Sequence, residues 1–377
     1  MAPSSKAARS KKVAMEDGVD RLSTLPDGPL QHVLSFLPSR DAVRTSMLGR
    51  RWRDQWKSVR ALRVMDTKKF KSANGLNMFI NYLLLLRNRV PLDVVEIKCY
   101  GGDDLDESFR YIKQWVRYAL SLEVQVLRVC IIDEDILFEE DNMMRWPLPN
   151  RLITSRLLKK LELIRVESVG RSLDFSSCPA LKDLKMEFCD LQFDRITSLS
   201  LEHLSITYCA FKSNVRTRIC TPSLISLELV DCKERTPLLE RMPLLVSAFV
   251  RLRYCCDYCA KSYEVGDCGD NSCEGCRGSN IGNCTSVLLE GLSDAANLEL
   301  TAETAVLIFR KDLTQCPVFS KLKTLLLNDW CLTANLGALI CILQHSPKLE
   351  KLTLQLPEVS VSSWRGHNLA TDAATLS

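Results

Sequence analysis

Residues 158–163 read Leu158-Lys159-Lys160-Leu161-Glu162-Leu163, and the spacing Leu-x-x-Leu-x-Leu in this stretch decides the fold. The same spacing returns along the chain, in stretches that begin at Leu181, Leu201, Leu224, Leu322 and Leu349. Weaker copies occupy 245–250 and 295–300, and degenerate copies occupy 92–97 and 124–129. Successive copies between Leu158 and Leu245 start roughly 20–23 residues apart, and a regular period of this length indicates that one structural unit is repeated many times.

Each copy supplies one short strand with two inward-facing leucines, and a single unit cannot bury these leucines alone. Stacked units build a continuous core and a parallel sheet, so we predict an α/β leucine-rich-repeat solenoid. Its strands are parallel, and its convex segments are short helices or irregular. The alternative, a doubly wound α/β sheet, needs longer helices than about 20 residues per unit allow. Near the carboxyl end the spacing becomes longer, from Leu322 to Leu349, and 334–344 has the pattern of a helix.

Side chains that alternate with the inward leucines point to the concave face, where repeat proteins bind their partners. These candidate substrate-binding residues are Glu162, Lys185, Glu187, Ser205, Thr207, Glu228, Asn328, Thr353 and Gln355. The set mixes both charges, whereas a nucleic-acid backbone calls for a row of Lys and Arg. We therefore expect a protein substrate on this face.

A different pattern precedes the repeats. Between residues 25 and 37, apolar side chains recur at the spacing of one helix face, at Leu30, Val33, Leu34 and Leu37. Pro38 ends this helix, and a second helix is expected at 41–47. A third short helix carries Trp52 and Trp56 on one face. Three short helices bury little area, so this module should need a partner.

These residues resemble an F-box. The resemblance covers 22–60 and rests on the start Leu25-Pro26-Asp27, the break Leu37-Pro38 and the close Arg50-Arg51-Trp52. In that family the module docks onto Skp1, which connects it to a cullin scaffold. Carried over by position, the Skp1-binding residues are Leu25, Pro26, Leu30, Leu34 and Leu37, with Trp52 organising the fold. Gly28-Pro29 and Gly49 depart from the commoner residues, and Gly49 weakens the local helix by up to about 1 kcal/mol.

The whole pattern resembles plant F-box/leucine-rich-repeat proteins, in which degenerate repeats end in an FBD-like segment similar to Phe319–Leu354. The chain then divides into a disordered basic arm (1–18), an F-box (19–62), a leucine-rich-repeat solenoid (63–358) and a polar tail (359–377). The solenoid carries a Cys-rich insertion at 253–285. The tail is too short for a further domain of the kind found in such relatives.

Two Cys-x-x-Cys pairs stand in this insertion, Cys256/Cys259 and Cys273/Cys276. The spacing between the pairs resembles that of structural zinc sites, in which four thiolates hold one tetrahedral ion. The alternative is a disordered acidic surface insertion, whose carboxylates would raise the thiol pKa values and oppose ligation. A structural zinc ion is therefore compatible with the sequence, although the expected function requires no cofactor. A RING is not predicted, because it usually needs a His and none lies between 204 and 344.

Composition argues against several classes of protein. The net charge of only +4 gives no argument for binding to nucleic acid or to a membrane surface. No apolar run reaches the roughly 18 residues that cross a bilayer. The amino terminus lacks the apolar core of a secretory signal. Many of the 17 cysteines stand singly in apolar segments, as buried thiols of a reducing compartment do, at Cys130, Cys189, Cys209, Cys232 and Cys341. We expect an intracellular protein of the nucleus or cytoplasm, with the basic residues 6–12 as a candidate import signal.

The sequence contains no phosphate-binding Gly loop, Gly-x-Ser-x-Gly or His-Glu-x-x-His, and its four histidines are scattered. We therefore predict a non-catalytic adaptor of an SCF (Skp1–cullin–F-box) ubiquitin ligase. Its expected partners are a Skp1-like protein, through it a cullin and a RING subunit, and a protein substrate that is recruited for ubiquitination and degradation. Two alternatives stay open: a zinc-stabilised nucleic-acid-binding protein, and a repeat scaffold that acts outside ubiquitin transfer.

Overall fold

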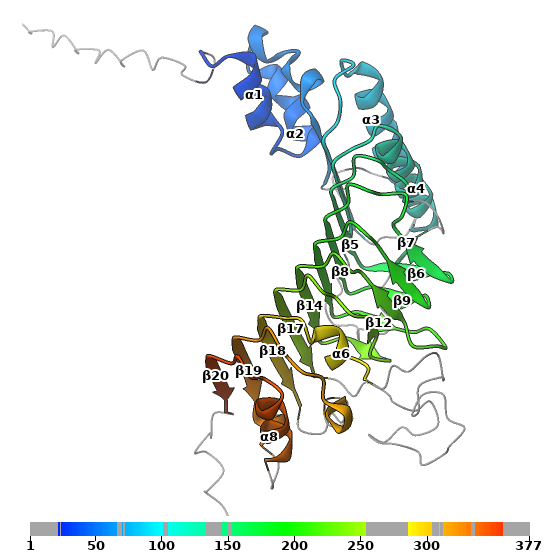
Figure 1. Cartoon of the computed structure of the whole chain (residues 1–377). Helices are drawn as coiled ribbons and strands as arrows, with labels where there is room; N and C mark the ends of the chain where they lie inside the picture. Colours follow the sequence, from blue (N-terminus) through cyan, green and yellow to red (C-terminus); the bar gives the residue numbers. More distant parts are fainter. Residues whose placement is uncertain are drawn as a thin grey trace, which may run out of the picture.

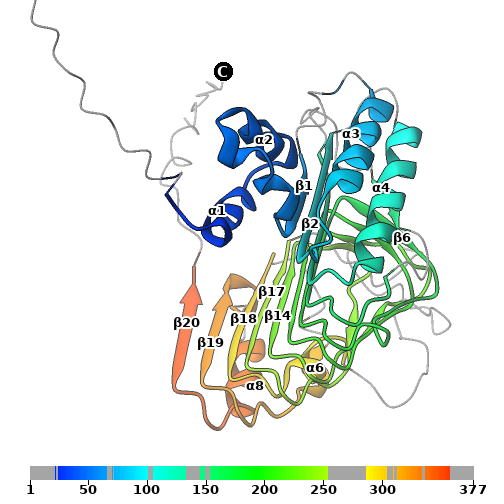
Figure 2. The ribbon, with the colours of Figure 1, turned by 90° about the horizontal axis from the view of Figure 1, so that it is seen from above.

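The computed structural model describes residues 22, 24–65, 70, 72–100, 105–132, 145–148, 153–253, 286–303, 309, 312–332 and 336–356. These residues form a curved stack of repeats with a small helical module at the amino-terminal end (Figure 1). One 11-stranded sheet lines the inside of the curve, and helices and shorter strands cover its outer side (Figures 1 and 2). The predicted basic arm, most of the Cys-rich insertion and the whole polar tail (359–377) lie outside the described residues.

The amino-terminal module contains two α-helices, α1 (Asp27–Leu34) and α2 (Ser39–Arg44). The second helix, expected at 41–47, ends at Arg44, and its last part forms the 3₁₀ turn η1 (Thr45–Met47). The expected third helix is instead divided into two 3₁₀ turns, η2 (Arg50–Trp52) and η3 (Gln55–Ser58). Gly49 lies in an extended conformation directly before η2, and a glycine has little tendency to continue a helix. Trp52 and Trp56 are nevertheless both buried.

The concave sheet runs from the helical module to the last repeat, and all of its strand pairs are parallel. In order, its strands are β1 (Ala61–Val64), β2 (Val94–Tyr100), β3 (Val126–Ile132), β5 (Lys160–Ile164), β8 (Asp183–Glu187), β11 (His203–Thr207), β14 (Ser226–Val230), β17 (Ser247–Leu252), β18 (Asn297–Ala302), β19 (Thr324–Asn328) and β20 (Lys351–Gln355). Each copy of the leucine spacing coincides with one of these strands. The predicted solenoid is confirmed.

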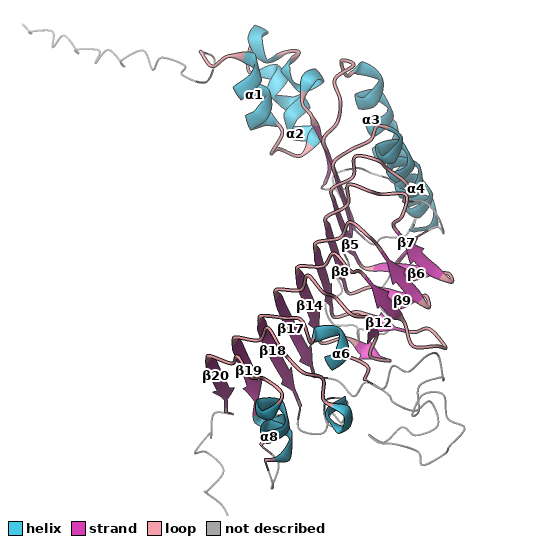
Figure 3. Cartoon of the chain, in the orientation of Figure 1, coloured by secondary structure: helices cyan, strands magenta, loops and turns pink. Residues whose placement is uncertain are grey.

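The convex side differs between the middle and the ends of the solenoid (Figure 3). In the middle, the chain between successive concave strands contributes short strands to two further parallel sheets. Their strands are β4 (Trp146–Leu148), β6 (Val166–Val169), β9 (Asp190–Gln192), β12 (Ala210–Phe211) and β15 (Lys233–Glu234), and β7 (Ser172–Asp174), β10 (Arg195–Thr197), β13 (Arg218–Cys220) and β16 (Leu238–Leu239). Longer repeats at the ends carry α3 (Ala73–Leu86), α4 (Leu105–Ser121), α6 (Leu289–Leu292), η6 (Leu313–Gln315), η7 (Asp329–Cys331) and α8 (Gly337–Gln344). The length of a repeat decides whether its convex segment forms strands or a helix. A helix rises less per residue than a strand and therefore uses more chain to cover the same distance.

A left-handed residue marks the same corner in four successive middle repeats. Arg165, Phe188, Tyr208 and Asp231 directly follow β5, β8, β11 and β14, and their φ angles are 48–56°. Each donates its backbone N–H to a carbonyl at the end of the next concave strand, at 2.8–3.1 Å. This hydrogen bond helps to offset the roughly 1–2 kcal/mol that a left-handed residue other than glycine costs. The corner turns the chain from the concave sheet to the convex side.

The inward leucines form a continuous core along the sheet, and those of the middle strands are at most 2% exposed at Leu161, Leu184, Leu204 and Leu227. The last strand differs, because Leu352 and Leu354 in β20 are 36% and 38% exposed. Among the predicted buried thiols, those of Cys189, Cys209 and Cys232 are buried, whereas those of Cys130 and Cys341 are half-buried. None of the described helices is long and apolar enough to cross a membrane.

Candidate functional site

The concave sheet presents its outward side chains in ladders, because parallel strands in register place equivalent residues side by side. One ladder contains Glu162, Lys185, Ser205 and Glu228, and it continues along β17 to β20 as Phe249, Glu299, Leu326 and Thr353. The next ladder includes Glu187, Thr207, Arg251, Thr301, Asn328 and Gln355. The nine predicted substrate-binding residues thus lie on one face of the sheet, and their role in binding stays a prediction.

Polar side chains in the amino-terminal half of this face pair with one another. The pairs are Arg128–Glu162 (2.6 Å), Lys185–Glu187 (2.8 Å) and Ser205–Glu228 (2.7 Å). Burial raises the pKa of Glu162, but hydrogen bonds and positive charge from Lys160 and Arg128 outweigh burial, so the pKa lies below its ordinary value. These groups already satisfy one another, which leaves them less to offer to a partner.

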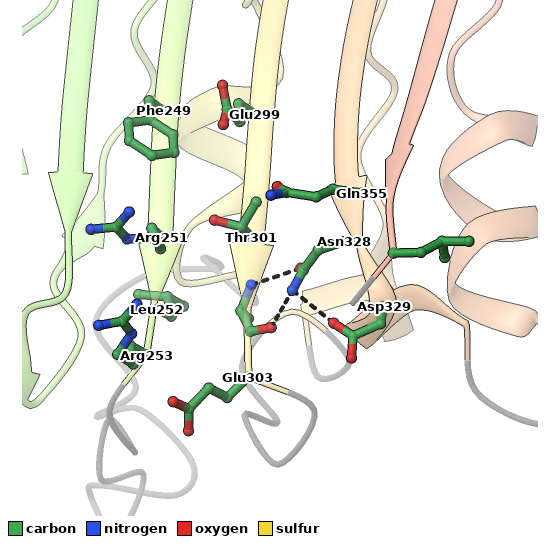
Figure 4. Close-up of a pocket in the computed structure, with 12 residues that line it drawn as sticks. Phe249, Arg251, Leu252, Arg253, Glu299, Thr301, Glu303, Asn328, Asp329 and Gln355 are labelled. Carbon is green, nitrogen blue, oxygen red and sulfur yellow. Dashed lines mark hydrogen bonds between the residues drawn. The ribbon is translucent and has the colours of Figure 1, made fainter. Parts of the chain in front are cut away.

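A pocket of about 520 Å³ lies at the other end of the face, across β17, β18, β19 and β20 (Figure 4). It is lined by Phe249, Arg251, Leu252, Arg253, Glu299, Thr301, Ala302, Glu303, Asn328, Asp329, Gln355 and Leu356. Phe249 and Glu299 are directly opposite each other on neighbouring strands. The volume is in the range of ligand-binding clefts and is large enough for one or two side chains of a bound protein.

Two polar residues of the pocket are held by the protein itself. The Arg251 guanidinium binds the Asp231 carboxylate at 2.7 Å, and Asp231 is completely buried. The Asn328 side chain accepts from the Ala302 backbone N–H at 2.9 Å and donates to the Ala302 carbonyl at 2.8 Å (Figure 4). Its role is therefore at least partly structural.

The remaining charges of the pocket are mainly negative. Glu299, Glu303 and Asp329 contribute three carboxylates, and Arg253 contributes one guanidinium beyond the paired Arg251. The half-buried ring of Phe249 stands beside Glu299. An aromatic face next to a carboxylate suits a lysine or arginine side chain, which gains both a cation–π contact and an ion pair.

Of the predicted substrate-binding residues, only Asn328 and Gln355 line the pocket. Sequence reasoning misses Phe249 and Glu299 because they lie in the weak copies at 245–250 and 295–300. The alternation rule would have found them there, since they occupy the position that Glu162 has in its own strand.

Thr207 is buried and Thr353 is exposed on the last strand, so the two threonines differ in what they can contact.

The residues carried over from the F-box pattern fall into two groups. Leu30, Leu34 and Trp52 are at most 8% exposed and pack with Val59 and Ala61 in a small core. Leu25 and Leu37 are half-buried and Pro26 is exposed. A buried side chain cannot contact a partner without a rearrangement, so the first group stabilises the module. The apolar residues most exposed on the module are Leu22, Val33, Phe36, Met47 and Leu48.

The four predicted metal ligands, Cys256, Cys259, Cys273 and Cys276, lie outside the described residues. Within the described ranges, a different group comes together at the convex side of the last repeats. Ligand atoms of Cys316, Cys341 and His345 all lie within 4.8 Å of one another. This set is compatible with a metal ion, and nothing in the sequence had connected its members.

Residues 22–63 match the F-box domain. The chain thus combines an F-box domain with a leucine-rich-repeat solenoid. The chain is 28% identical to the rice protein named MEIOTIC F-BOX protein MOF (Oryza sativa subsp. japonica), over 89% of this chain and 71% of that relative. It is 26% and 24% identical to two F-box/LRR-repeat proteins of Arabidopsis thaliana, over 89% and 90% of this chain and 77% and 93% of theirs. Its homologues over most of the chain are thus plant proteins of the F-box/LRR-repeat type.

Proposed function

We propose that this chain is the substrate-recognition adaptor of an SCF ubiquitin ligase. The F-box binds a Skp1-like protein, which connects it to a cullin and a RING subunit, and the concave sheet holds a protein substrate. The chain supplies no catalytic group. Ubiquitin transfer is accelerated because the substrate is held at high effective concentration near the recruited conjugating enzyme.

The observation that carries this proposal is the short, hydrogen-bonded connection between the F-box and the concave sheet. β1 begins shortly after η3 ends, and it pairs with β2 as the first strand of the sheet. Arg63 in β1 donates its backbone N–H to the Ser39 hydroxyl at 2.9 Å, and its guanidinium to the Ser35 carbonyl at 2.8 Å. The same guanidinium pairs with Glu96 in β2. An adaptor needs such a connection, because it fixes the distance between substrate and ligase.

We assign the Skp1-binding surface to exposed apolar side chains of the module rather than to its core. Phe36 is 64% exposed, Met47 85% and Leu48 69%. A module this small rarely exposes several large apolar side chains without a partner that covers them. Pro26 and Leu25, from the predicted set, are accessible enough to join this surface.

The test uses the full chain co-expressed with a Skp1-like protein. Met47→Asp/Leu48→Asp should abolish co-purification and leave the circular dichroism spectrum unchanged. Leu199→Asp is the matched control, because Leu199 is 77% exposed but lies in the solenoid, and it should retain binding. Retention by the double variant would contradict the assigned surface. If the unmodified chain does not bind a Skp1-like protein, the adaptor proposal itself fails.

On the substrate side, we infer that the pocket around Phe249 and Glu299 receives a basic side chain of the bound protein. The support is the acidic excess of its lining and the aromatic ring beside a carboxylate. The amino-terminal half of the concave face, with its internal ion pairs, contributes shape more than charge. A substrate that lies along the sheet therefore contacts mainly β17, β18, β19 and β20.

A further inference from the structure

Two cysteines and a histidine meet behind the last two strands of the solenoid. Cys316 directly follows η6, Cys341 lies within α8, and His345 directly follows the last residue of α8. Cys316 and Cys341 belong to different segments of the chain, yet their ligand atoms and one of His345 lie within 4.8 Å of one another. The fold, and not the local sequence, creates this cluster.

The spacing of the donor atoms suits one tetrahedral ion. Zinc–sulfur and zinc–nitrogen bonds of about 2.3 and 2.0 Å place two ligands of such a site roughly 3.5–3.8 Å apart. The three side chains bring donor atoms within 4.8 Å of one another, so these atoms need to approach by about 1 Å to reach this spacing. Cys341 and His345 are four positions apart on one helical turn, which puts both on the same face.

Neighbouring groups orient the imidazole and bind the two thiols only weakly. Nδ1 of His345 donates to the Cys341 carbonyl at 2.8 Å, which orients the imidazole beside the thiols and leaves Nε2 as the nitrogen that can bind an ion. The thiols make the weak hydrogen bonds usual for sulfur: the Pro317 carbonyl is 3.6 Å from the Cys316 sulfur, and the Leu313 carbonyl is 3.7 Å from the Cys341 sulfur. All three side chains are half-buried, which lets an ion enter and shields it afterwards.

We propose that Cys316, Cys341 and His345 bind one zinc ion, with water as the fourth ligand. Two sulfurs and one imidazole nitrogen are a donor set that zinc favours over magnesium or calcium. The ion joins α8 to the segment before β19, to which a hydrogen bond from the Phe319 N–H to the His345 carbonyl already links the end of α8. The cysteines bind as thiolates, so two protons are released and affinity falls as the pH is lowered.

A zinc ion that joins α8 to the segment before β19 would stabilise the last repeat. The last strand leaves Leu352 and Leu354 more than a third exposed, and Leu336, Ile340 and Leu343 around α8 are exposed as well. The terminal repeat therefore gains less from burial than the middle repeats do. A metal ion that closes the 316–341 loop compensates for this weak end by restricting its opening.

The first experiment measures zinc in the full chain, purified under reducing conditions. It uses a background in which Cys256, Cys259, Cys273 and Cys276 are all replaced by Ser. The insertion then keeps only Cys255, Cys268 and Cys284, too few for a four-cysteine site. This parent should hold one equivalent, and Cys341→Ser and His345→Gln should each lose most of it. Cys130→Ser is the control, because Cys130 is a half-buried thiol of the concave sheet, and it should keep the ion. Equal zinc in all four proteins, or none in the parent, would overturn the proposal.

A second readout needs no substitution in the cluster and is therefore safe against misfolding. X-ray absorption of the zinc-loaded parent should show two sulfurs and two lighter ligands around the ion. A shell of four sulfurs, or of none, would contradict the site. Removal of zinc with a chelator should raise the hydrogen exchange of α8 at least several-fold and leave α1 unchanged. Unchanged hydrogen exchange in α8 would refute the stabilising role of the ion.

Discussion

Asp231 and Arg251 form a bidentate ion pair at the carboxyl ends of the neighbouring strands β14 and β17. Nε of Arg251 lies 3.1 Å from each carboxylate oxygen of Asp231, and Nη2 lies 2.7 Å from Oδ2. Asp231 is the left-handed corner residue after β14, and Arg251 lines the pocket from β17. A corner of one repeat thus positions a pocket residue of the next. The hydrogen bonds and charge of Asp231 also raise the pKa of Arg251.

Replacing Asp231 with Ala should destabilise the solenoid by about 2–3 kcal/mol. The carboxylate is fully buried, and its loss leaves the Arg251 guanidinium without its partner; the cost stays below the roughly 3–5 kcal/mol of a fully buried pair because Arg251 is one third exposed. Urea unfolding followed by circular dichroism measures the difference. Arg253→Ala, an exposed arginine of the same pocket, should change stability by less than about 0.5 kcal/mol. Similar values for both variants would argue against a structural ion pair.

Two neighbouring positions of α1 separate folding from partner binding. Leu30→Ala should lower the unfolding free energy by about 2–5 kcal/mol, because Leu30 is completely buried. Val33→Ala should leave stability within about 0.5 kcal/mol, because Val33 is 47% exposed, and should weaken binding to a Skp1-like protein instead. Thermal unfolding and calorimetric titration measure the two effects. The assignment is wrong if Val33→Ala unfolds the module or binds as well as the unmodified chain.

Phe249→Ala and Glu299→Lys should reduce substrate capture without lowering the melting temperature. The first removes the aromatic wall of the pocket, and the second reverses the charge that favours a basic side chain. Quantitative mass spectrometry of proteins bound to each variant in cells measures the change. Arg171→Glu, an exposed residue after β6 on the convex side, reverses a charge elsewhere and should leave capture unchanged. Equal effects of all three substitutions would place the substrate elsewhere.

Stability should fall at acid pH partly through Asp294. Burial raises its pKa, but hydrogen bonds and charge from Lys321 and Arg241 outweigh burial, so the folded pKa lies below the ordinary value. The unfolded chain then binds the proton more readily, and this contribution is present above about pH 4 and lost as the pH falls through the folded pKa. Urea unfolding at several pH values should give a shallower acid dependence for Asp294→Asn. Parallel curves for the two proteins would contradict it.

Two glycines should respond to alanine to different extents. A Cβ on Gly291 would lie 2.4 Å from the Leu239 Cβ and 2.7 Å from its carbonyl oxygen, where α6 packs on β16. Gly291→Ala should therefore cost about 1–3 kcal/mol. Gly28 in α1 has open space around it apart from its chain neighbours, but a Cβ at the position before Pro29 disfavours the helical conformation. Gly28→Ala should therefore change stability by less than about 1 kcal/mol. Differential scanning calorimetry measures both. A neutral Gly291→Ala would show that this contact yields easily.

The sequence predicted well what depends on local spacing. The alternation around Leu161 and Leu163 specifies a strand with one buried face, and its nearly regular recurrence along the chain specifies a stack of such strands. Convex strands such as β9 and β12 were not predicted, because such short runs show no period of their own. The helix pattern around Leu30 and Leu34 identified an apolar face but could not show whether the module's own core or a partner covers it.

The sequence by itself therefore determined the repeat, the direction of its core and the F-box pattern, because each depends on residues a few positions apart. Tertiary structure decided which polar side chains are engaged and which are accessible. Asp231 meets Arg251, Arg63 meets Glu96, and Cys316 meets His345 only because stacking brings segments of successive repeats into contact. Such pairings depend on the register between repeats and on the length of each convex segment, and neither quantity leaves a local pattern in the sequence.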